Sequence, residues 1–296
     1  MRKPIVVLII IALIAVSLVV AYTLLQGKEV RVRVTTTTSL YATGLLDYLA
    51  EAFSKSNPNV VFDFIPVGSG EALRRAANGD ACMVFVHAPS LEKQYILKGV
   101  ITNRRIFAYN YFIVAGPYDD PAGVKNAPNV VEAFKRIYIA GEKGKAKFVS
   151  RGDNSGTHVK ELSIWSLTGL DPHGKPWYLE TGSGMAQTLL VANEEKAYVL
   201  SDIGTFLKLK KEGKIPNLEI LYTNDTELIN IYSVYIVTSC TGAEKEAALK
   251  FIGFIVSEGQ ELIAKYGVSE YGQRLFNPAK GGIEWLEEVW EQLSSK

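Results

Sequence analysis

Metal-ligating and redox-active residues are scarce in this sequence. Its 296 residues include two cysteines, Cys82 and Cys240, and three histidines, His87, His158 and His173, which do not cluster along the chain. Zinc sites need three or four such ligands, usually at short spacings, so we expect neither a metal site nor a cofactor. Cys82 lies within an apolar run, where a buried free thiol is the default state, and a disulfide with Cys240 is the alternative.

An excess of charge of one sign is lacking too. Lysine and arginine number 32 against 31 acidic residues, which gives a formal net charge of +1. Nucleic-acid-binding proteins concentrate positive charge on one surface, so this balance gives no support to a nucleic-acid partner. No long internal repeat or low-complexity tract interrupts the chain, and 48% of its residues are hydrophobic. That length and composition predict a large core, divided between two domains rather than one.

The longest uncharged stretch runs from Pro4 to Gln26 and follows Arg2 and Lys3. A secretory signal has an apolar region of about 7–15 residues, whereas a spanning helix needs about 20. We therefore expect residues 1–28 to form an N-terminal transmembrane helix that stays uncleaved; a cleaved signal segment is the alternative. With the positive end in the cytoplasm, the rest of the chain would lie at the outer face of the cell membrane, or be periplasmic or secreted after cleavage.

Beyond residue 28, short apolar stretches alternate with amphipathic helical ones. Strands are predicted at 30–34, 60–67 and 81–86, and each precedes a stretch with helical spacing of apolar residues. This alternation predicts an α/β protein with a parallel sheet. Two longer apolar runs, 106–116 and 229–238, are expected to carry the chain from one lobe to the other and back.

Four loops rich in glycine and hydroxyl side chains each follow a predicted strand and precede a predicted helix: residues 36–39, 68–70, 150–157 and 181–185. Ligands of open α/β sheets bind beyond the carboxyl ends of the strands. Helix N-termini offer free N–H groups and a partial positive charge there, and Arg151 adds a permanent one. Ser, Thr and Asp are also ordinary helix caps. Four such loops at equivalent positions nevertheless favour an anion site between the two halves of the chain.

The same loops resemble those of the tungstate-binding proteins of ABC transporters. The motifs that carry the resemblance are Thr36-Thr37-Thr38-Ser39 with Gly44-Leu45-Leu46-Asp47, Val67-Gly68-Ser69-Gly70, His87-Ala88-Pro89, Asn103-Arg104-Arg105, Ser150 to His158 and Thr181-Gly182-Ser183-Gly184-Met185. The resemblance implies a two-lobed type II periplasmic-binding-protein fold with two crossing strands. Lobe 1 would comprise residues 29–110 and 232–296, and lobe 2 residues 111–231. It also implies a monomer whose partners are an ABC permease and its ATPase.

The resemblance places the oxyanion contacts on seven residues, with three further candidates. The seven are Thr38, Ser39, Ser69, Arg151, Ser155, Gly156 and Thr157, and the further candidates are Thr37, Gly184 and Met185. Ser69 stands where threonine is more usual, which keeps the hydroxyl, and residues 40–43 are less polar than the pattern, so no contacts are carried over there. His87 is interpreted as a structural polar residue.

The donors favour an anion without a proton. Tungstate and molybdate are unprotonated dianions at neutral pH, so their best site supplies donors and no close acceptor, whereas phosphate needs a carboxylate for its remaining proton. Arg151-x-Asp153-x-Ser155-Gly156-Thr157 also resembles phosphate-binding proteins, the nearest alternative. Asp153 is expected to orient the Arg151 guanidinium instead of binding a proton. The residues therefore favour an unprotonated oxyanion, and the resemblance implies that it is tungstate, with molybdate as the alternative that the sequence does not separate from it.

Two other classes of function compete with this one. A hydrolase would need a nucleophile and a base, and Ser155 or Thr157 with His158 is the local candidate pair. Neighbouring residues diverge on a helix, which disfavours that pairing. A membrane-anchored sensor would need a cytoplasmic segment, and Met1 to Lys3 is all that precedes the uncharged stretch. We expect a binding protein with no catalytic residues.

Overall fold

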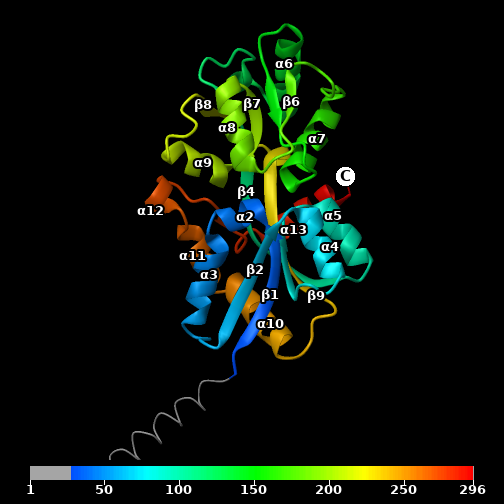
Figure 1. Cartoon of the computed structure of the whole chain (residues 1–296), viewed down its shortest axis with the longest axis vertical. Helices are drawn as coiled ribbons and strands as arrows, with labels where there is room; N and C mark the ends of the chain where they lie inside the picture. Colours follow the sequence, from blue (N-terminus) through cyan, green and yellow to red (C-terminus); the bar gives the residue numbers. More distant parts are fainter. Residues whose placement is uncertain (1–27, 296) are drawn as a thin grey trace, which may run out of the picture.

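The computed structural model describes residues 28–295, which form two α/β lobes, one above the other in Figure 1. Ten strands join into one sheet with the order β2-β1-β3-β9-β4-β7-β5-β6, and β8 and β10 pair with β4. Within residues 28–295, no helix has both the length and the apolar character needed to cross a bilayer. The predicted transmembrane helix falls on residues that lie outside the described part of the chain.

Lobe 1 contains the first three strands, which are parallel to one another. Its other strands, β9, β4 and β10, each pair antiparallel with their neighbours. β1 pairs with β2 and β3 in parallel, and β9 runs antiparallel to both β3 and β4. The bounds of the strands are β1 (Val30–Thr37), β2 (Val60–Val67), β3 (Met83–Val86), β4 (Ile101–Pro117), β9 (Ile229–Val237) and β10 (Asn277–Pro278).

Helices cover both faces of this part of the sheet: α2 (Thr38–Ala42), α3 (Leu45–Ser54), α4 (Ser69–Ala77), α5 (Pro89–Leu97), α10 (Gly242–Val256), α11 (Gly259–Lys265), α12 (Val268–Tyr271) and α13 (Ile283–Ser294). Apolar residues spaced three to four apart give α3 one buried face, which packs on β1 and α10. Aromatic rings fill the centre of this core, with Phe251 4.2 Å from Phe62 between ring centroids.

Lobe 2 repeats the arrangement with a smaller parallel set. β5 (Phe148–Ser150) pairs in parallel with β6 (Tyr178–Glu180) and β7 (Tyr198–Asp202), and β8 (Leu218–Tyr222) runs antiparallel to β4. Its helices are η1 (Val124–Asn126), α6 (Val130–Glu142), α7 (Gly156–Thr168), α8 (Met185–Glu195), α9 (Ile203–Lys211) and η2 (Thr226–Leu228). Trp165 of α7 is buried against Phe134 and Phe148 and anchors α7 to the core.

β4 connects the lobes. Its first part, from Ile101 to Tyr111, pairs with β9, and residues from Phe112 onward pair with β7 and β8 of lobe 2. β9 brings the chain back to lobe 1 (Figure 1). β4 and β9 contain the two apolar runs that were predicted to cross between the lobes. The boundary proposed at residue 110 falls inside β4.

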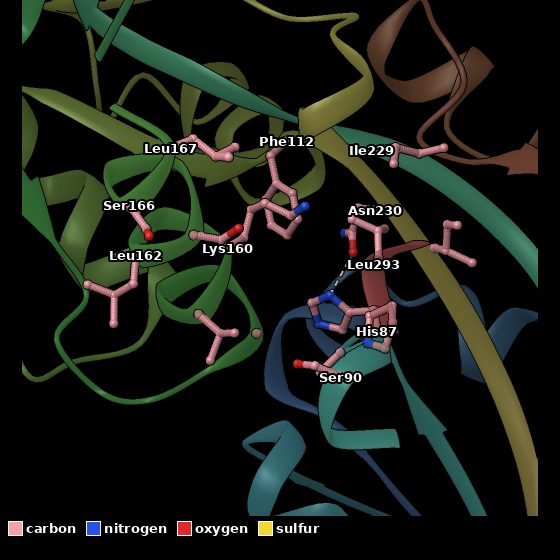
Figure 2. Close-up of a pocket in the computed structure, with 16 residues that line it drawn as sticks. His87, Ser90, Phe112, Lys160, Leu162, Ser166, Leu167, Ile229, Asn230 and Leu293 are labelled. Atoms are coloured by element: carbon pink, nitrogen blue, oxygen red, sulfur yellow. Dashed lines mark hydrogen bonds between the residues drawn. The ribbon is translucent and has the colours of Figure 1, made fainter. Parts of the chain in front are cut away.

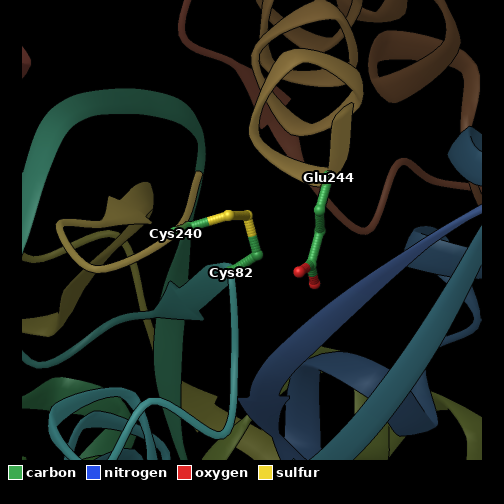
Figure 3. A group of neighbouring side chains, drawn as sticks. All are labelled: Cys82, Cys240 and Glu244. Carbon is green, nitrogen blue, oxygen red and sulfur yellow. A yellow bond between two sulfur atoms is a disulfide. The ribbon is translucent and has the colours of Figure 1, made fainter. Parts of the chain in front are cut away.

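The expectation of a free thiol was wrong, because Cys82 and Cys240 form a disulfide across 158 residues of sequence (Figure 3). Cys82 precedes β3 and Cys240 follows β9, which is its antiparallel neighbour, so the pairing of these strands brings the two residues together. The carboxylate of Glu244 lies within 4.8 Å of both sulfurs. Its oxygens accept hydrogen bonds from Arg33, and the oxidised sulfurs offer no thiolate, so the group is a structural link.

Candidate functional site

The carboxyl ends of the parallel strands of both lobes face each other and enclose a small cavity. It is lined by residues that follow β1, β2, β3 and β5: Thr37, Thr38, Ser39, Val67, Gly68, Ser69, His87, Arg151, Ser155, Gly156 and Thr157. Its volume of about 10 Å³ is room for about one water-sized group, which leaves no space for an organic substrate in this arrangement. Three of the four predicted loops therefore meet at one place.

Lobe 1 contributes the N-termini of α2 and α4. Thr37 caps α2, since its Oγ1 accepts a hydrogen bond from Leu40 N at 3.2 Å, and Ser39 Oγ lies 3.5 Å from the same Oγ1. Gly68 caps α4 without a side-chain bond, and Ser69, the first residue of α4, is 1% exposed. Hydroxyl groups at the first turns of two helices thus form one wall of the cavity.

Lobe 2 contributes the loop that joins β5 to α7. Arg151 is 5% exposed, and its Nη2 donates to Asp153 Oδ2 at 2.6 Å. The other carboxylate oxygen of Asp153 accepts from Ser155 N at 3.1 Å. Asp153 therefore orients the guanidinium, as expected from the sequence. Ser155 caps α7 by accepting from His158 N, which leaves Gly156 and Thr157 in the first turn of the helix.

Three donors on the cavity wall retain unused hydrogen-bonding capacity. Within residues 28–295, Ser69 Oγ, Arg151 Nε and Thr157 Oγ1 are buried and have no hydrogen-bond partner. Buried polar atoms in folded proteins are almost always paired, because leaving one unpaired costs about 1–3 kcal/mol. The three come from different elements and from both lobes, yet their residues line one cavity, where a ligand that accepts hydrogen bonds would satisfy them.

The electrostatics of the cavity favour an anion. The N-termini of α2, α4 and α7 all point into it, and each adds partial positive charge and N–H groups. Arg151 adds a full positive charge. Among the described residues that line the cavity there is no carboxylate. The nearest one, Asp153, is already paired with Arg151.

His87 also lines the cavity, and the sequence interpretation left it out of the site. It follows β3, is 5% exposed, and stacks on Tyr232 at 5.0 Å between ring centroids. Figure 2 shows its ring bonded to Asn230 through Nδ1 at 2.8 Å. Burial lowers the pKa of His87 to about 4, despite the bond to Asn230, so the ring is neutral at pH 7. One sequence feature could have placed His87 in the site. It follows a predicted buried strand, as the predicted loops do.

Gly184 and Met185 do not reach this cavity. Gly184 caps α8, and Met185 is 4% exposed among the apolar side chains of lobe 2. Their loop has a supporting position instead. Thr181 Oγ1 donates to the carbonyl oxygens of Ser150 and Arg151 at 3.3 and 3.4 Å. The fourth predicted loop thus contacts the backbone of the Arg151 loop and does not itself line the cavity.

His87 and Gly156 line a second, larger cavity as well as the small one, and Figure 2 shows His87 among the side chains of the larger cavity. Its volume is about 510 Å³ and its walls are largely apolar, with Leu162 and Leu167 from α7 and Ile229 from β9. His87 therefore forms part of the partition between the small polar cavity and a wider opening.

Proteins of known family resemble this chain in sequence and in fold. Residues 26–259 match the family model described as a PBP superfamily domain. The tungstate-binding protein TupA of Peptoclostridium acidaminophilum is 39% identical over 82% of this chain and 84% of its own. The solved structure of TupA from Desulfovibrio alaskensis G20 has 38% identity and a TM-score of 0.73, and the match covers 84% of this chain and 98% of that one.

A second solved structure, of the tungstate ABC transporter from Geobacter sulfurreducens, is 40% identical with a TM-score of 0.70, covering 80% of this chain and 98% of that chain. These matches extend over both lobes and the cavity between them. The chain therefore belongs to the PBP superfamily and, within it, to the family of TupA tungstate-binding proteins.

Proposed function

We propose that this protein is the extracytoplasmic substrate-binding component of an ABC transporter and that it captures tungstate between its lobes. Molybdate is the second proposed cargo. The bound form delivers the anion to an ABC permease that is driven by its ATPase. The protein acts as a monomer, without a cofactor, a resident metal or a nucleic-acid partner. The names of the similar proteins support this assignment, and the chemistry of the cavity supports it independently.

The observation that carries the proposal is the set of buried donors without partners, Ser69 Oγ, Arg151 Nε and Thr157 Oγ1. A tetrahedral, proton-free dianion presents only acceptors and can satisfy all three at once. The proposed contacts are Thr37, Thr38, Ser39, Ser69, Arg151, Ser155, Gly156 and Thr157. Gly184 and Met185 are omitted from this set because they lie outside the cavity. Phosphate is the less favoured ligand because none of the described lining residues has a carboxylate to accept its proton.

The geometry around His158 argues against a hydrolase. Its Nδ1 accepts a hydrogen bond from Asn154 N at 3.0 Å, and its backbone N–H is bonded to Ser155 Oγ. The ring of His158 is therefore not placed to take a proton from Ser155 or Thr157. A nucleophile needs its base within hydrogen-bond distance, so we propose binding without chemistry.

Closure of the lobes is the proposed mechanical step. Donors from both lobes reach one ligand only in the closed arrangement, so the free energy of binding favours closure. α9 of lobe 2 also meets lobe 1 at the opposite edge, where Lys211 pairs with Glu270 at 3.2 Å. Both of these side chains are more than half exposed, so this pair contributes little to closure.

The proposed location is outside the cytoplasm. The Cys82–Cys240 disulfide is typical of oxidising compartments and supports this location. Anchoring by residues 1–28, with a cleaved segment as the alternative, is a proposal that rests on the sequence alone.

The test is calorimetric titration of the purified protein with tungstate, molybdate, sulfate and phosphate at neutral pH. We expect saturable 1:1 binding of tungstate, and of molybdate, with much weaker binding of phosphate. Tight binding of phosphate together with weak binding of tungstate would reassign the cargo. Hydrolysis of phosphate or carboxylate esters by the purified protein would contradict the binding-only function.

A further inference from the structure

A buried chain of amides fixes the position of the hydrogen on His87. Asn110 Nδ2 donates to the backbone carbonyl oxygen of Leu275 at 3.2 Å, and Asn230 Nδ2 donates to Asn110 Oδ1 at 3.1 Å. A carbonyl oxygen can only accept, so the orientation of Asn110 follows from Leu275 and that of Asn230 from Asn110. Asn230 Oδ1 then faces His87 Nδ1 at 2.8 Å and must accept from it. The neutral ring therefore has its hydrogen on Nδ1 and a lone pair on Nε2.

This lone pair faces the ligand side of the cavity. His87 Nε2 lies 3.4 Å from Ser39 Oγ, and both residues line the cavity. With a neutral ring, His87 Nε2 offers the Ser39 hydroxyl hydrogen an acceptor, and Thr37 Oγ1 at 3.5 Å offers another. When this hydrogen points at either of them, Ser39 Oγ presents only lone pairs to the cavity. An oxyanion also presents only lone pairs, so this arrangement opposes its binding. The conflict disappears if Nε2 carries a second hydrogen.

We propose that His87 takes up one proton from solvent when the oxyanion binds. The new N–H bond forms at Nε2 and donates to Ser39 Oγ, and the Ser39 hydroxyl hydrogen turns to the anion. His87 and Arg151 then supply two positive charges for a dianion, and all the side chains on the wall act as donors. The inference rests on the proposed function, since it concerns the same site and adds how its charge is matched.

The groups around His87 are compatible with this exchange. Arg151 from the β5–α7 loop opposes protonation, and burial does so more strongly. The other ionisable groups of the neighbouring elements have contacts of their own. Tyr232 of β9 stacks on the ring, and its hydroxyl accepts a hydrogen bond from Asn230. Glu92 of α5 accepts a hydrogen bond from Ala88 N. Asp153 accepts one from Arg151. Asp202 caps α9, and Lys160 lines the larger cavity with His87.

A bound dianion changes this balance. An opposite charge within about 4–6 Å raises the pKa of a cationic acid by ~1–3 units, and a dianion brings two such charges. From a starting pKa of about 4 in the free protein, such a shift raises the pKa of His87 toward neutral pH. The larger cavity, which His87 also lines, gives a route for the proton.

The test is titration of the protein with sodium tungstate in buffers of different ionisation enthalpy, which counts protons taken up. At pH 6.5 we expect about 0.5–1 proton per anion, and affinity that weakens at least about twofold between pH 6.5 and 8.5, since proton-linked binding falls as pH rises. His87→Gln is expected to abolish both effects. His173→Gln is the matched control, because His173 is exposed, pairs with Asp171 and lies outside the cavity.

The outcomes separate the two proposals. Tungstate binding with less than about 0.1 proton taken up and a flat pH profile would overturn the role of His87 and leave the proposed function intact. Failure to bind any of the four oxyanions would overturn both. If His87→Gln does not fold, nitrogen-15 spectra of histidine-labelled wild-type protein give the answer. The His87 Nε2 resonance must change from an unprotonated to a protonated shift on adding tungstate, and an unchanged resonance contradicts the inference.

Discussion

Gly156 of lobe 2 lies directly against His87 of lobe 1. A methyl group added at Gly156 would come within 3.2 Å of His87 Cε1 and 3.3 Å of Ser69 Oγ. Contacts this short are uncommon for real side chains, so the absence of a side chain at Gly156 lets α7 approach α4 and His87. The closed arrangement of the lobes thus depends on a glycine at this first turn.

We expect Gly156→Ala to weaken tungstate binding by roughly five- to a hundredfold, because overpacking costs about 1–3 kcal/mol and acts here on the closed form. Small-angle scattering should show less compaction on adding tungstate than for the wild type. The thermal stability of the ligand-free protein should not fall, since alanine is favoured over glycine within a helix.

Gly184→Ala is the matched control for this prediction. Gly184 also precedes a helix of lobe 2, and a methyl group there would meet no atom within 4 Å. Its affinity should equal that of the wild type. A loss of tungstate affinity as large as that of Gly156→Ala would show that the contact with His87 is not the cause of the weaker binding.

Arg151→Ala should reduce tungstate affinity by at least about thirtyfold, because truncating one partner of a buried charge pair costs about 2–5 kcal/mol. Part of this loss arises because Asp153, bonded to Arg151 Nη2 at 2.6 Å, would then face the anion unpaired. Calorimetry gives the affinity directly. Arg31→Ala, which removes an exposed arginine paired with Glu29 and Asp63, should leave it unchanged.

The stability of the folded protein is expected to depend on pH through the buried carboxyl group of Glu161. It is 2% exposed, and burial raises its pKa to about 7 although Tyr178 Oη donates to it at 2.6 Å. A carboxyl whose pKa is raised by folding stabilises the protein below its unfolded pKa, and this contribution is lost as pH rises through about 7. Glu161→Gln removes the ionisation, so it should raise the melting temperature relative to the wild type more at pH 8 than at pH 5.

The control for the pH effect is Glu132→Gln, since Glu132 is a partly exposed residue of α6 paired with Arg136. The difference in melting temperature between this variant and the wild type should stay nearly constant from pH 5 to pH 8. An equal melting temperature of Glu161→Gln and wild type at pH 8 would contradict the prediction.

Replacing Cys82 and Cys240 together by alanine should lower the free energy of unfolding by about 2–5 kcal/mol, because the disulfide closes a long loop in the unfolded chain. Denaturant unfolding with and without a reductant measures the effect. Tungstate affinity should change little, because neither sulfur lines the cavity. A reductant-insensitive wild type would show that the disulfide does not form in solution.

Much of the fold could be predicted from the sequence because its signals are local. Alternating apolar strands and amphipathic helices indicated the α/β class, and the long apolar runs at 106–116 and 229–238 indicated the strands between the lobes. The loops at 36–39, 68–70 and 150–157 were found by their glycine and hydroxyl content. Arg151 and Asp153 were linked by a spacing of two residues, which the hydrogen bond at 2.6 Å confirms.

The rest depends on contacts between distant parts of the chain. Cys82 and Cys240 are joined only because β3 and β9 are antiparallel neighbours, and a pairing across 158 residues leaves no local pattern. The hydrogen-bond partner that fixes the His87 ring is Asn230, which is 143 residues away. The loop with Gly184 and Met185 had the expected composition, but it contacts the site only indirectly, through the bonds from Thr181 Oγ1 to the carbonyl oxygens of Ser150 and Arg151.

The continuity of β4 limits the ways in which the lobes can move. One 17-residue strand belongs to the sheets of both lobes, and its ladder to β9 ends where its ladder to β7 begins, at Tyr111 and Phe112. Sliding one lobe past the other would break hydrogen bonds on both sides of that junction, whereas twisting or bending the strand there leaves both ladders in register. Opening should therefore be a rotation about an axis near Tyr111, with the largest displacement at the tips farthest from it.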